Sequence, residues 1–344
     1  MKPFVNRHYS SALASSTRKY GAVALGAALA LSMAACSSTG GAQDSGDSGS
    51  NAGTADTPRA TIAMVTHEAP GDTFWDLIRK GAEAAAAKDN IELVYSNDNQ
   101  GPRQATLVQS AIDSKVDGIA VTMAFPDAIA PGVTAATDAG IPVTAFNSGK
   151  DQALEAGAIS YFGQDETLAG VTAGERLTQE GAKKVLCVVQ EQGSVALEAR
   201  CAGVKQGFSG GTVENLNVNG TDMPSVESTI QAKLQQDPSI DQVVTLGAPI
   251  ALAAVQSADS AGSSAKISTF DTNAALVDAI KSGDVQWAID QQPYLQGYLA
   301  VDSLWLYLNN KNVIGGGQAV LTGPSFIDNT NIDAVADLAA AGTR

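Results

Sequence analysis

The chain has 344 residues, of which 44% are hydrophobic and 17% are charged, and its formal charge is −15 because 36 acidic residues outnumber 21 Lys and Arg. So acidic a balance makes nucleic acid and anionic lipid poor partners. The length is sufficient for an N-terminal leader followed by two domains of ordinary size.

Residues 1–35 have the order of charges and apolar residues that is typical of a secretory signal peptide. Four cations precede an apolar run at about 21–33: Lys2, Arg7, Arg18 and Lys19. The run is shorter than the roughly 20 residues that span a bilayer. Loss of these cations would take the formal charge from −15 to −19. We therefore expect an exported protein.

The segment LSMAAC at 31–36 resembles a bacterial lipoprotein cleavage site, with Met33 where leucine is usual. This resemblance implies that Cys36 becomes the lipidated first residue and anchors the protein to the outer face of the cell membrane, because two or more acyl chains give a stable anchor. Cleavage nearby that leaves a free thiol is the alternative. Residues 36–58 continue with small and polar residues, which predict a flexible tether.

From residue 59 onward, short apolar runs alternate with helix-length amphipathic segments. After the first run, at 60–66, the next segment places on one helical face Phe74, Leu77, Ile78, Gly81 and Ala85. Further strands are predicted at 91–96, 118–123, 141–146, 158–162, 183–190, 212–218, 242–246, 266–270 and 285–289. The alternation predicts an α/β fold with two doubly wound parallel-sheet lobes.

Polar residues follow many of these strands: Thr66, His67, Glu68, Asn97, Asp98, Asn147, Ser148, Gln190, Glu191 and Asp271. Ligands of open parallel sheets bind beyond the carboxyl ends of the strands. Asp and Asn also cap helices, so position alone does not separate a ligand contact from a cap. Carboxylates, amides and one arginine beside aromatic rings suit a neutral polyhydroxyl ligand, since each hydroxyl both donates and accepts.

Two aromatic side chains near the first predicted helix have two interpretations each. Trp75 is expected off the core-facing stripe, where it would cover a sugar C–H face, or it is a partly exposed residue of a packed helix. His67 is either a contact in the ligand crevice or an ordinary loop residue.

Several segments together resemble the type I periplasmic sugar-binding proteins across nearly the whole folded chain. They are DTFW at 72–75, GIPVTAFNSG at 140–149, EARCAG at 198–203, ISTFDTN at 267–273 and WAIDQQP at 287–293. The resemblance implies that the following residues contact a sugar: Asp72, Phe74, Asn147, Arg200, Asp271 and Gln291. It also implies a small neutral polyol ligand and an ABC permease as membrane partner, and a monomer is expected. Neither a metal nor a cofactor is expected, because one histidine remains after the signal peptide and the sequence has no G-x-G-x-x-G or P-loop motif.

The same resemblance implies a hinge of three chain crossings, near 163–165, 290–293 and 322–324. The N-terminal lobe would then contain 59–164 and 292–322, and the C-terminal lobe 165–291 and 323–344. Ligand bound between the lobes would favour their closed arrangement.

Three departures from the family bear on which sugar fits. Ser148 replaces a frequent arginine, Thr122 stands near a family asparagine, and the loop at 247–249 lacks an asparagine that the ribose binders have. Ribose specificity therefore does not transfer, and a hexose, cyclitol or sugar alcohol is expected.

A disulfide between Cys187 and Cys201 is predicted, because export permits it and the two residues lie on a strand and on the helix that packs back on it. Two buried thiols are the alternative.

Catalysis is not expected. Residues 207–211 spell G-x-S-x-G, but a helix precedes them and a strand follows, the reverse of a nucleophile elbow. Without the signal peptide, His67 is the one remaining histidine that could serve an active site. The carboxylates of Glu191 and Asp271 could hydrolyse a glycoside as a pair, but binding of hydroxyls is the simpler interpretation. The main alternative to transport is a receptor that presents its ligand to a membrane sensor.

Overall fold

The computed structural model describes residues 54–344, all of which belong to one unit of the chain, Asn51–Arg344. The predicted signal peptide, the lipidation site at Cys36 and most of the predicted tether lie outside the described residues. Among residues 54–344, no helix is both long enough and apolar enough to cross a membrane.

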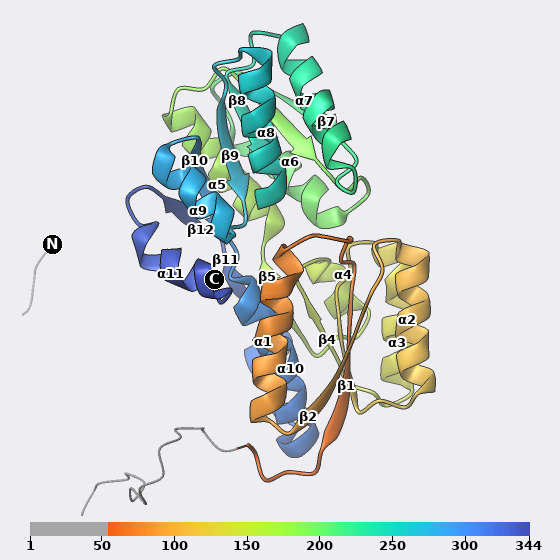
Figure 1. Ribbon diagram of the computed structural model, residues 1–344. Coiled ribbons are helices and arrows are strands. Elements are labelled where there is room, and N and C mark those ends of the chain that lie inside the picture. The colour runs from red at the N-terminus through yellow and green to blue at the C-terminus, as the bar shows by residue number, and fades with distance from the viewer. Residues whose placement is uncertain (1–53) are drawn as a thin grey trace, which may run out of the picture. The chain divides into compact units, whose positions relative to one another are not determined.

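The first sheet has the strand order β11-β5-β4-β3-β1-β2, and all its strand pairs are parallel. Figure 1 shows β1 and β4 of this sheet in one lobe and β8 and β9 of a second sheet in another lobe. Its strands are β1 (Ala60–Thr66), β2 (Ile91–Asn97), β3 (Gly118–Val121), β4 (Val143–Phe146), β5 (Ser160–Gln164) and β11 (Ala319–Gly323). The helices with it are α1 (Phe74–Lys88), α2 (Gly101–Asp113), α3 (Pro126–Asp138), α4 (Lys150–Glu155) and α10 (Pro293–Asn310), with the 3₁₀ turn η1 (Ile314–Gly317). This sheet and its helices are the first lobe.

The second sheet has the order β12-β10-β9-β8-β6-β7. Its strands are β6 (Lys184–Val189), β7 (Thr212–Asn217), β8 (Gln242–Thr245), β9 (Lys266–Phe270), β10 (Val285–Asp290) and β12 (Ser325–Asp328). The helices with it are α5 (Glu166–Gln179), α6 (Val195–Gly207), α7 (Met223–Gln236), α8 (Ala248–Ala261), α9 (Ala274–Ser282) and α11 (Asp333–Ala341). This sheet and its helices are the second lobe.

The strands β6 to β10 repeat the order of β1 to β5, so the two lobes are built on the same plan. The predicted fold class of two doubly wound α/β lobes is therefore confirmed. One strand departs from a purely parallel arrangement, because β12 pairs antiparallel with β10. Neither β11 nor β12 was predicted, because both are partly exposed edge strands without a continuous apolar run.

Apolar side chains cover both faces of each sheet. Every residue of the central strands β3, β4 and β8 is buried. Parallel strands buried on both faces read as continuous apolar runs, which is why the sequence predicted them well. In the second lobe, α5 and α6 approach so closely that a methyl group on Gly170 would collide with the carbonyl oxygen of Arg200. This approach places the start of α5 beside the side chain of Arg200.

The chain passes between the lobes three times: from β5 to α5, from β10 to α10, and from β11 to β12. The last passage contains a cis peptide bond between Gly323 and Pro324. Because the second passage includes Gln291, a segment that joins the lobes also reaches the region between them.

The structure joins Cys187 on β6 and Cys201 on α6 in a disulfide, with their Cα atoms 5.9 Å apart. Both residues are buried in the apolar layer beneath α5 and α6. The disulfide therefore fixes the middle of α6 to the strand on which it packs.

Candidate ligand-binding site

A cavity of about 570 Å³ is lined by residues of both lobes. It lies beyond the carboxyl ends of the strands, where ligands of open α/β sheets bind. All nine residues that the sequence analysis singled out line it: His67, Asp72, Phe74, Trp75, Asn147, Glu191, Arg200, Asp271 and Gln291. Residues as far apart in the sequence as His67 and Gln291 thus border one space.

Asn147 and Asp271 occupy equivalent places in the two lobes, directly after β4 and β9. Both have positive φ angles, of 66° and 65°, and Asn and Asp are enriched among the non-glycine residues that adopt this conformation. Their backbone N–H groups donate to carbonyl oxygens of the neighbouring strands, Phe162 of β5 and Ile289 of β10. The backbone thus leaves the sheet in the same way twice and delivers a short polar side chain to the cavity each time.

A continuous chain of hydrogen bonds runs along the cavity floor from one lobe to the other. Asn147 Nδ2 donates to Gln291 Oε1 at 3.4 Å, and Gln291 Nε2 donates to Asp271 Oδ1 at 2.7 Å. Arg200 Nη1 lies 3.5 Å from Asp271 Oδ2. All four residues are at least 94% buried. Such groups keep fixed directions, because hydrogen bonds are stronger in a buried network than at the surface.

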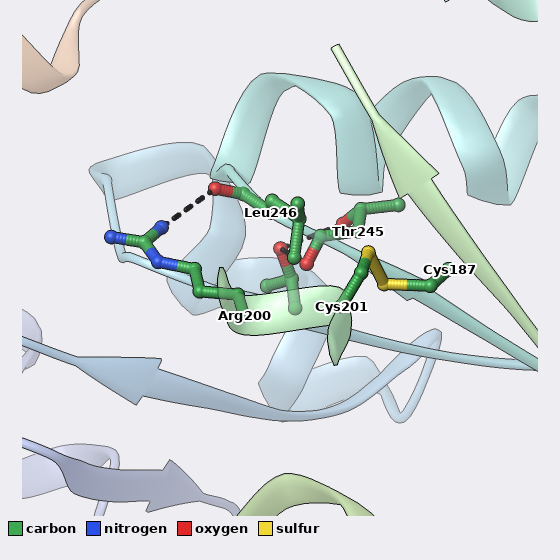
Figure 2. The surroundings of a disulfide bond; sticks show 6 residues. Cys187, Arg200, Cys201, Thr245 and Leu246 are labelled. Atoms are coloured by element: carbon green, nitrogen blue, oxygen red, sulfur yellow. Dashed lines mark hydrogen bonds between the residues drawn. A yellow bond between two sulfur atoms is a disulfide. The ribbon is translucent and has the colours of Figure 1, made fainter. Parts of the chain in front are cut away.

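Arg200 is only 3% exposed, and its guanidinium contacts three groups of the protein. Its Nε and Nη2 donate to the two carboxylate oxygens of Glu166 at 2.6 and 3.1 Å, a bidentate pair. Its Nη1 donates to the carbonyl oxygen of Leu246 at 3.1 Å, and Figure 2 shows the side chain reaching that carbonyl from the helix turn that carries Cys201. Burial works against its charge, but the neighbouring carboxylates raise the pKa of Arg200 above its usual value, so the guanidinium stays charged.

Glu166 is a functional residue that the sequence analysis missed. It is 9% exposed, begins α5 and accepts a further hydrogen bond from Gln164 Nε2 at 2.8 Å. Its position shortly after a predicted strand could have indicated a site residue. However, β5 ends where the chain crosses between the lobes, and the sequence does not show that α5 packs against α6.

Burial raises the pKa of Asp271 to about 7, although Arg200 and Gln291 act in the opposite direction. Burial also raises the pKa of Glu191 to about 7, and the charge of Asp72 adds to this. Both carboxyl groups are therefore partly protonated near neutral pH, and each can then donate as well as accept.

These shifts predict a pH dependence of the ligand-free protein. Between the ordinary pKa of Asp271, 3.8, and its folded value of about 7, the folded chain binds more protons than the unfolded chain. The free energy of unfolding is therefore expected to fall as the pH rises through this window. Urea unfolding at a series of pH values measures the slope. Asp271→Asn should make the profile shallower, whereas Asp259→Asn, which changes an exposed aspartate of α8, should leave it unchanged; equal profiles in all three proteins would contradict the assignment.

Aromatic rings form one wall of the cavity, and here one sequence expectation is wrong. Trp75 was expected off the core-facing side of α1 and Phe74 on it, but Trp75 is 3% exposed and packs in the core of the first lobe, while Phe74 is only partly buried. The buried face of α1 includes Trp75, Leu77 and Ile78, because the indole is large enough to contact the core and still border the cavity. Its ring packs edge to face on His67 with centroids 4.7 Å apart.

Asp72 combines both roles that the sequence left open. Its Oδ1 accepts from the backbone N–H of Phe74 at 3.1 Å, so it supports the first turn of α1. It also lines the cavity, and burial raises its pKa.

Several of the predicted strand-end residues do not line the cavity, and some residues that line it were not predicted. Glu68 accepts from Arg79 and Tyr95, and Asp98 pairs with Arg103. Gln190, a predicted strand-end residue, also lines the cavity. The lining adds residues that lie just beyond predicted strands or at helix starts, and the signal of strand ends could have found several of them: Asn99, Phe125, Ser194, Asn219, Leu246 and Asn273.

The two lobes also meet beside the cavity. The backbone N–H of Val195 in the second lobe donates to the carbonyl oxygen of Ala124 in the first at 3.1 Å. A cavity that is lined by polar and aromatic side chains, between two α/β lobes joined by three chain crossings, defines a solute-binding protein of the periplasmic type.

Comparison with known proteins gives the same class. Residues 62–312 match the periplasmic binding protein domain. The crystal structure of a carbohydrate transporter from Acidothermus cellulolyticus 11B, in complex with myo-inositol, is 61% identical and covers 83% of this chain and all of that one, with a TM-score of 0.82. The chain belongs to the periplasmic binding protein family.

More distant relatives bind other sugars, according to their names. The ribose import binding protein of Bacillus subtilis is 24% identical over 70% of this chain and 79% of its own length. The xylose/arabinose-binding protein of Sulfolobus acidocaldarius is 26% identical over 65% of this chain, and the match spans 60% of that relative's length. These relatives are named as binding, import or transport proteins, and the family of the chain is one of binding proteins, in agreement with the expectation that the chain is not an enzyme.

Proposed function

We propose that this protein binds a cyclitol of the myo-inositol type between its lobes and delivers it to an ABC permease. The observation that carries the proposal is the 61% identity to a solved structure that contains myo-inositol, over all of that chain. A neutral cyclitol lies within the range of ligands that the residue types of the cavity predict.

The polar groups of the cavity suit a ligand with hydroxyls in several directions. Each hydroxyl that leaves water must donate and accept to avoid a cost of about 1–3 kcal/mol. Asp271 and Glu191 accept, Arg200 donates, and Asn147 and Gln291 do both. These side chains come from both lobes, so a ligand that contacts them all favours the closed arrangement.

The rings of Phe74 and Trp75 complete the match. A cyclitol presents C–H groups as well as hydroxyls, and aromatic faces can cover such groups while the polar side chains take the hydroxyls. A ligand without hydroxyls on several sides would leave buried polar atoms unpaired, which is the strongest basis for selectivity in such sites.

Calorimetry with myo-inositol tests the proposal, with D-ribose and D-xylose as comparison ligands. We expect tight binding of myo-inositol and at least tenfold weaker binding of either pentose. Asp271→Asn should weaken myo-inositol binding by about ten- to a hundredfold, because a hydrogen bond to a charged group contributes about 1.5–3 kcal/mol.

The matched control is Asp259→Asn, the same chemical change on the exposed side of α8, which should bind as the unchanged protein does. Preference for a pentose over myo-inositol would contradict the cyclitol assignment, and absence of binding to any polyol would remove the function itself.

The proposal includes export and anchoring. Residues 1–35 would be removed as a signal peptide, Cys36 would carry the lipid, and 36–58 would tether a monomer to the outer face of the membrane. The two lobes would then comprise 59–164 with 292–322, and 165–291 with 323–344. Radiolabelled palmitate incorporation that depends on Cys36 tests the anchor separately from binding.

A further inference from the structure

Three nitrogen atoms surround the side-chain oxygen of Thr122 in the first lobe. The backbone N–H of His67 donates to Thr122 Oγ1 at 3.1 Å, and Gln104 Nε2 donates to it at 3.2 Å. His67 Nδ1 lies 2.7 Å from the same oxygen. Thr122 and Gln104 are fully buried and His67 is 7% exposed, so water does not take part in these contacts.

The orientation of the Gln104 amide is fixed by a second contact. Its Nε2 also donates to the backbone carbonyl oxygen of Thr122 at 2.9 Å. A carbonyl oxygen can only accept, so the nitrogen of the amide, and not its oxygen, must face Thr122. The two hydrogens of this nitrogen serve the two oxygens of Thr122.

The count of lone pairs then decides the state of the histidine. A hydroxyl oxygen has two lone pairs and one hydrogen. The backbone N–H of His67 and the Nε2–H of Gln104 occupy the two lone pairs of Thr122 Oγ1. The hydroxyl hydrogen of Thr122 must therefore go to His67 Nδ1. Nδ1 is therefore an acceptor. Burial, together with the charge of Arg200, lowers the pKa of His67 to about 3, so the ring is neutral and its one N–H is at Nε2.

His67 Nε2 faces the opposite lobe across the cavity. It lies 3.9 Å from Glu191 Oε2, which is too long for a direct hydrogen bond. One ligand oxygen can lie about 2.8 Å from both atoms, which is an ordinary hydrogen-bond length. The ring of Trp75 packs against the imidazole and limits its rotation.

We infer that Thr122 and Gln104 hold His67 as the Nε2–H tautomer, and that this N–H donates to a ligand hydroxyl whose own proton goes to Glu191. Thr122 and Gln104 act as positioning residues, while His67 and Glu191 contact the ligand from different lobes. The ligand part rests on the proposed function, but the tautomer does not, because it follows from contacts within the protein.

Nitrogen NMR of the full chain tests the tautomer directly. The chain has two histidines, His8 and His67, so His67→Gln assigns the signals in a long-range ¹H–¹⁵N correlation spectrum. We expect a protonated Nε2 and an unprotonated Nδ1 at neutral pH. Thr122→Ser should keep this pattern, whereas Thr122→Val, which lacks the hydroxyl, should lose it. Thr144→Val removes another buried threonine hydroxyl of the first lobe and should leave it unchanged.

A protonated Nδ1 in the unchanged protein would overturn the tautomer. Calorimetry with myo-inositol tests the donor: Thr122→Val should bind about tenfold more weakly, as expected for one misdirected hydrogen bond, and Thr122→Ser should bind normally. Normal binding by a Thr122→Val protein that has lost the tautomer would overturn the donor role. If the unchanged protein shows the tautomer but does not bind myo-inositol, the proposed function fails and the tautomer remains.

Discussion

Replacing Arg200 by methionine is expected to lower the free energy of unfolding by about 3–5 kcal/mol and to abolish myo-inositol binding. The cause is the carboxylate that remains: Glu166 is 9% exposed and takes two charge-assisted hydrogen bonds from Arg200. Removing one partner of a buried pair leaves an uncompensated charge, which costs far more than the pair itself contributes. Asp271 would lose the same partner.

A second variant distinguishes two causes of the lost stability, the unpaired charge of Glu166 and the lost packing of the Arg200 side chain. Arg200→Met combined with Glu166→Gln removes both charges and should recover part of the lost stability without recovering binding. Urea unfolding followed by circular dichroism measures all three proteins. The control is Arg103→Met, because its ion pair with Asp98 involves an arginine that is 61% exposed and should contribute less than 1 kcal/mol. A double variant no more stable than Arg200→Met alone would contradict the charge explanation.

Removing the disulfide should have the second largest effect. We expect Cys187→Ala combined with Cys201→Ala to lower the free energy of unfolding by about 3 kcal/mol, since the bond closes a loop with a sequence separation of 14. Because Cys201 adjoins Arg200 on α6, myo-inositol affinity should fall as well. The unfolding free energy is again measured in urea.

Reductant provides the matched control for the disulfide. Added to the unchanged protein during unfolding, it should produce a similar loss of stability, and it should have no effect on the double alanine variant. A double alanine variant within 1 kcal/mol of the unchanged protein would show that the loop is constrained mainly by packing.

The fold could be predicted largely from the sequence, because buried parallel strands are short apolar runs between amphipathic helices. Strands such as β4 (Val143–Phe146) and β8 (Gln242–Thr245) are completely buried and were assigned by this pattern. The edge strands β11 and β12 were not assigned. They are partly exposed on one side, and their pairing depends on where the chain crosses between lobes.

The composition of the cavity was predictable for a different reason. Strand ends of a parallel sheet meet at one edge, so polar residues at those positions gather whatever their sequence distance, as Asn147 and Asp271 do. Contacts made by helices were harder to foresee. The position of Glu166 depends on the close approach of α5 to α6, and the burial of Trp75 depends on how α1 is turned, which a shift of one residue changes by about 100°.

The ion pairs of Arg200 have a consequence for the charge of the ligand that the cavity can accept. Among the residues that line the cavity, all within 54–344, Arg200 is the one Lys or Arg side chain, and Glu166 and Asp271 already flank it. A uronate or a phosphorylated sugar entering this space would give up its hydration without meeting an unpaired cation, and an amino sugar would meet carboxyl groups held partly neutral by burial. We therefore expect the cavity to discriminate against ionised ligands of either sign, because its one cation is already paired and burial keeps Asp271 and Glu191 partly protonated.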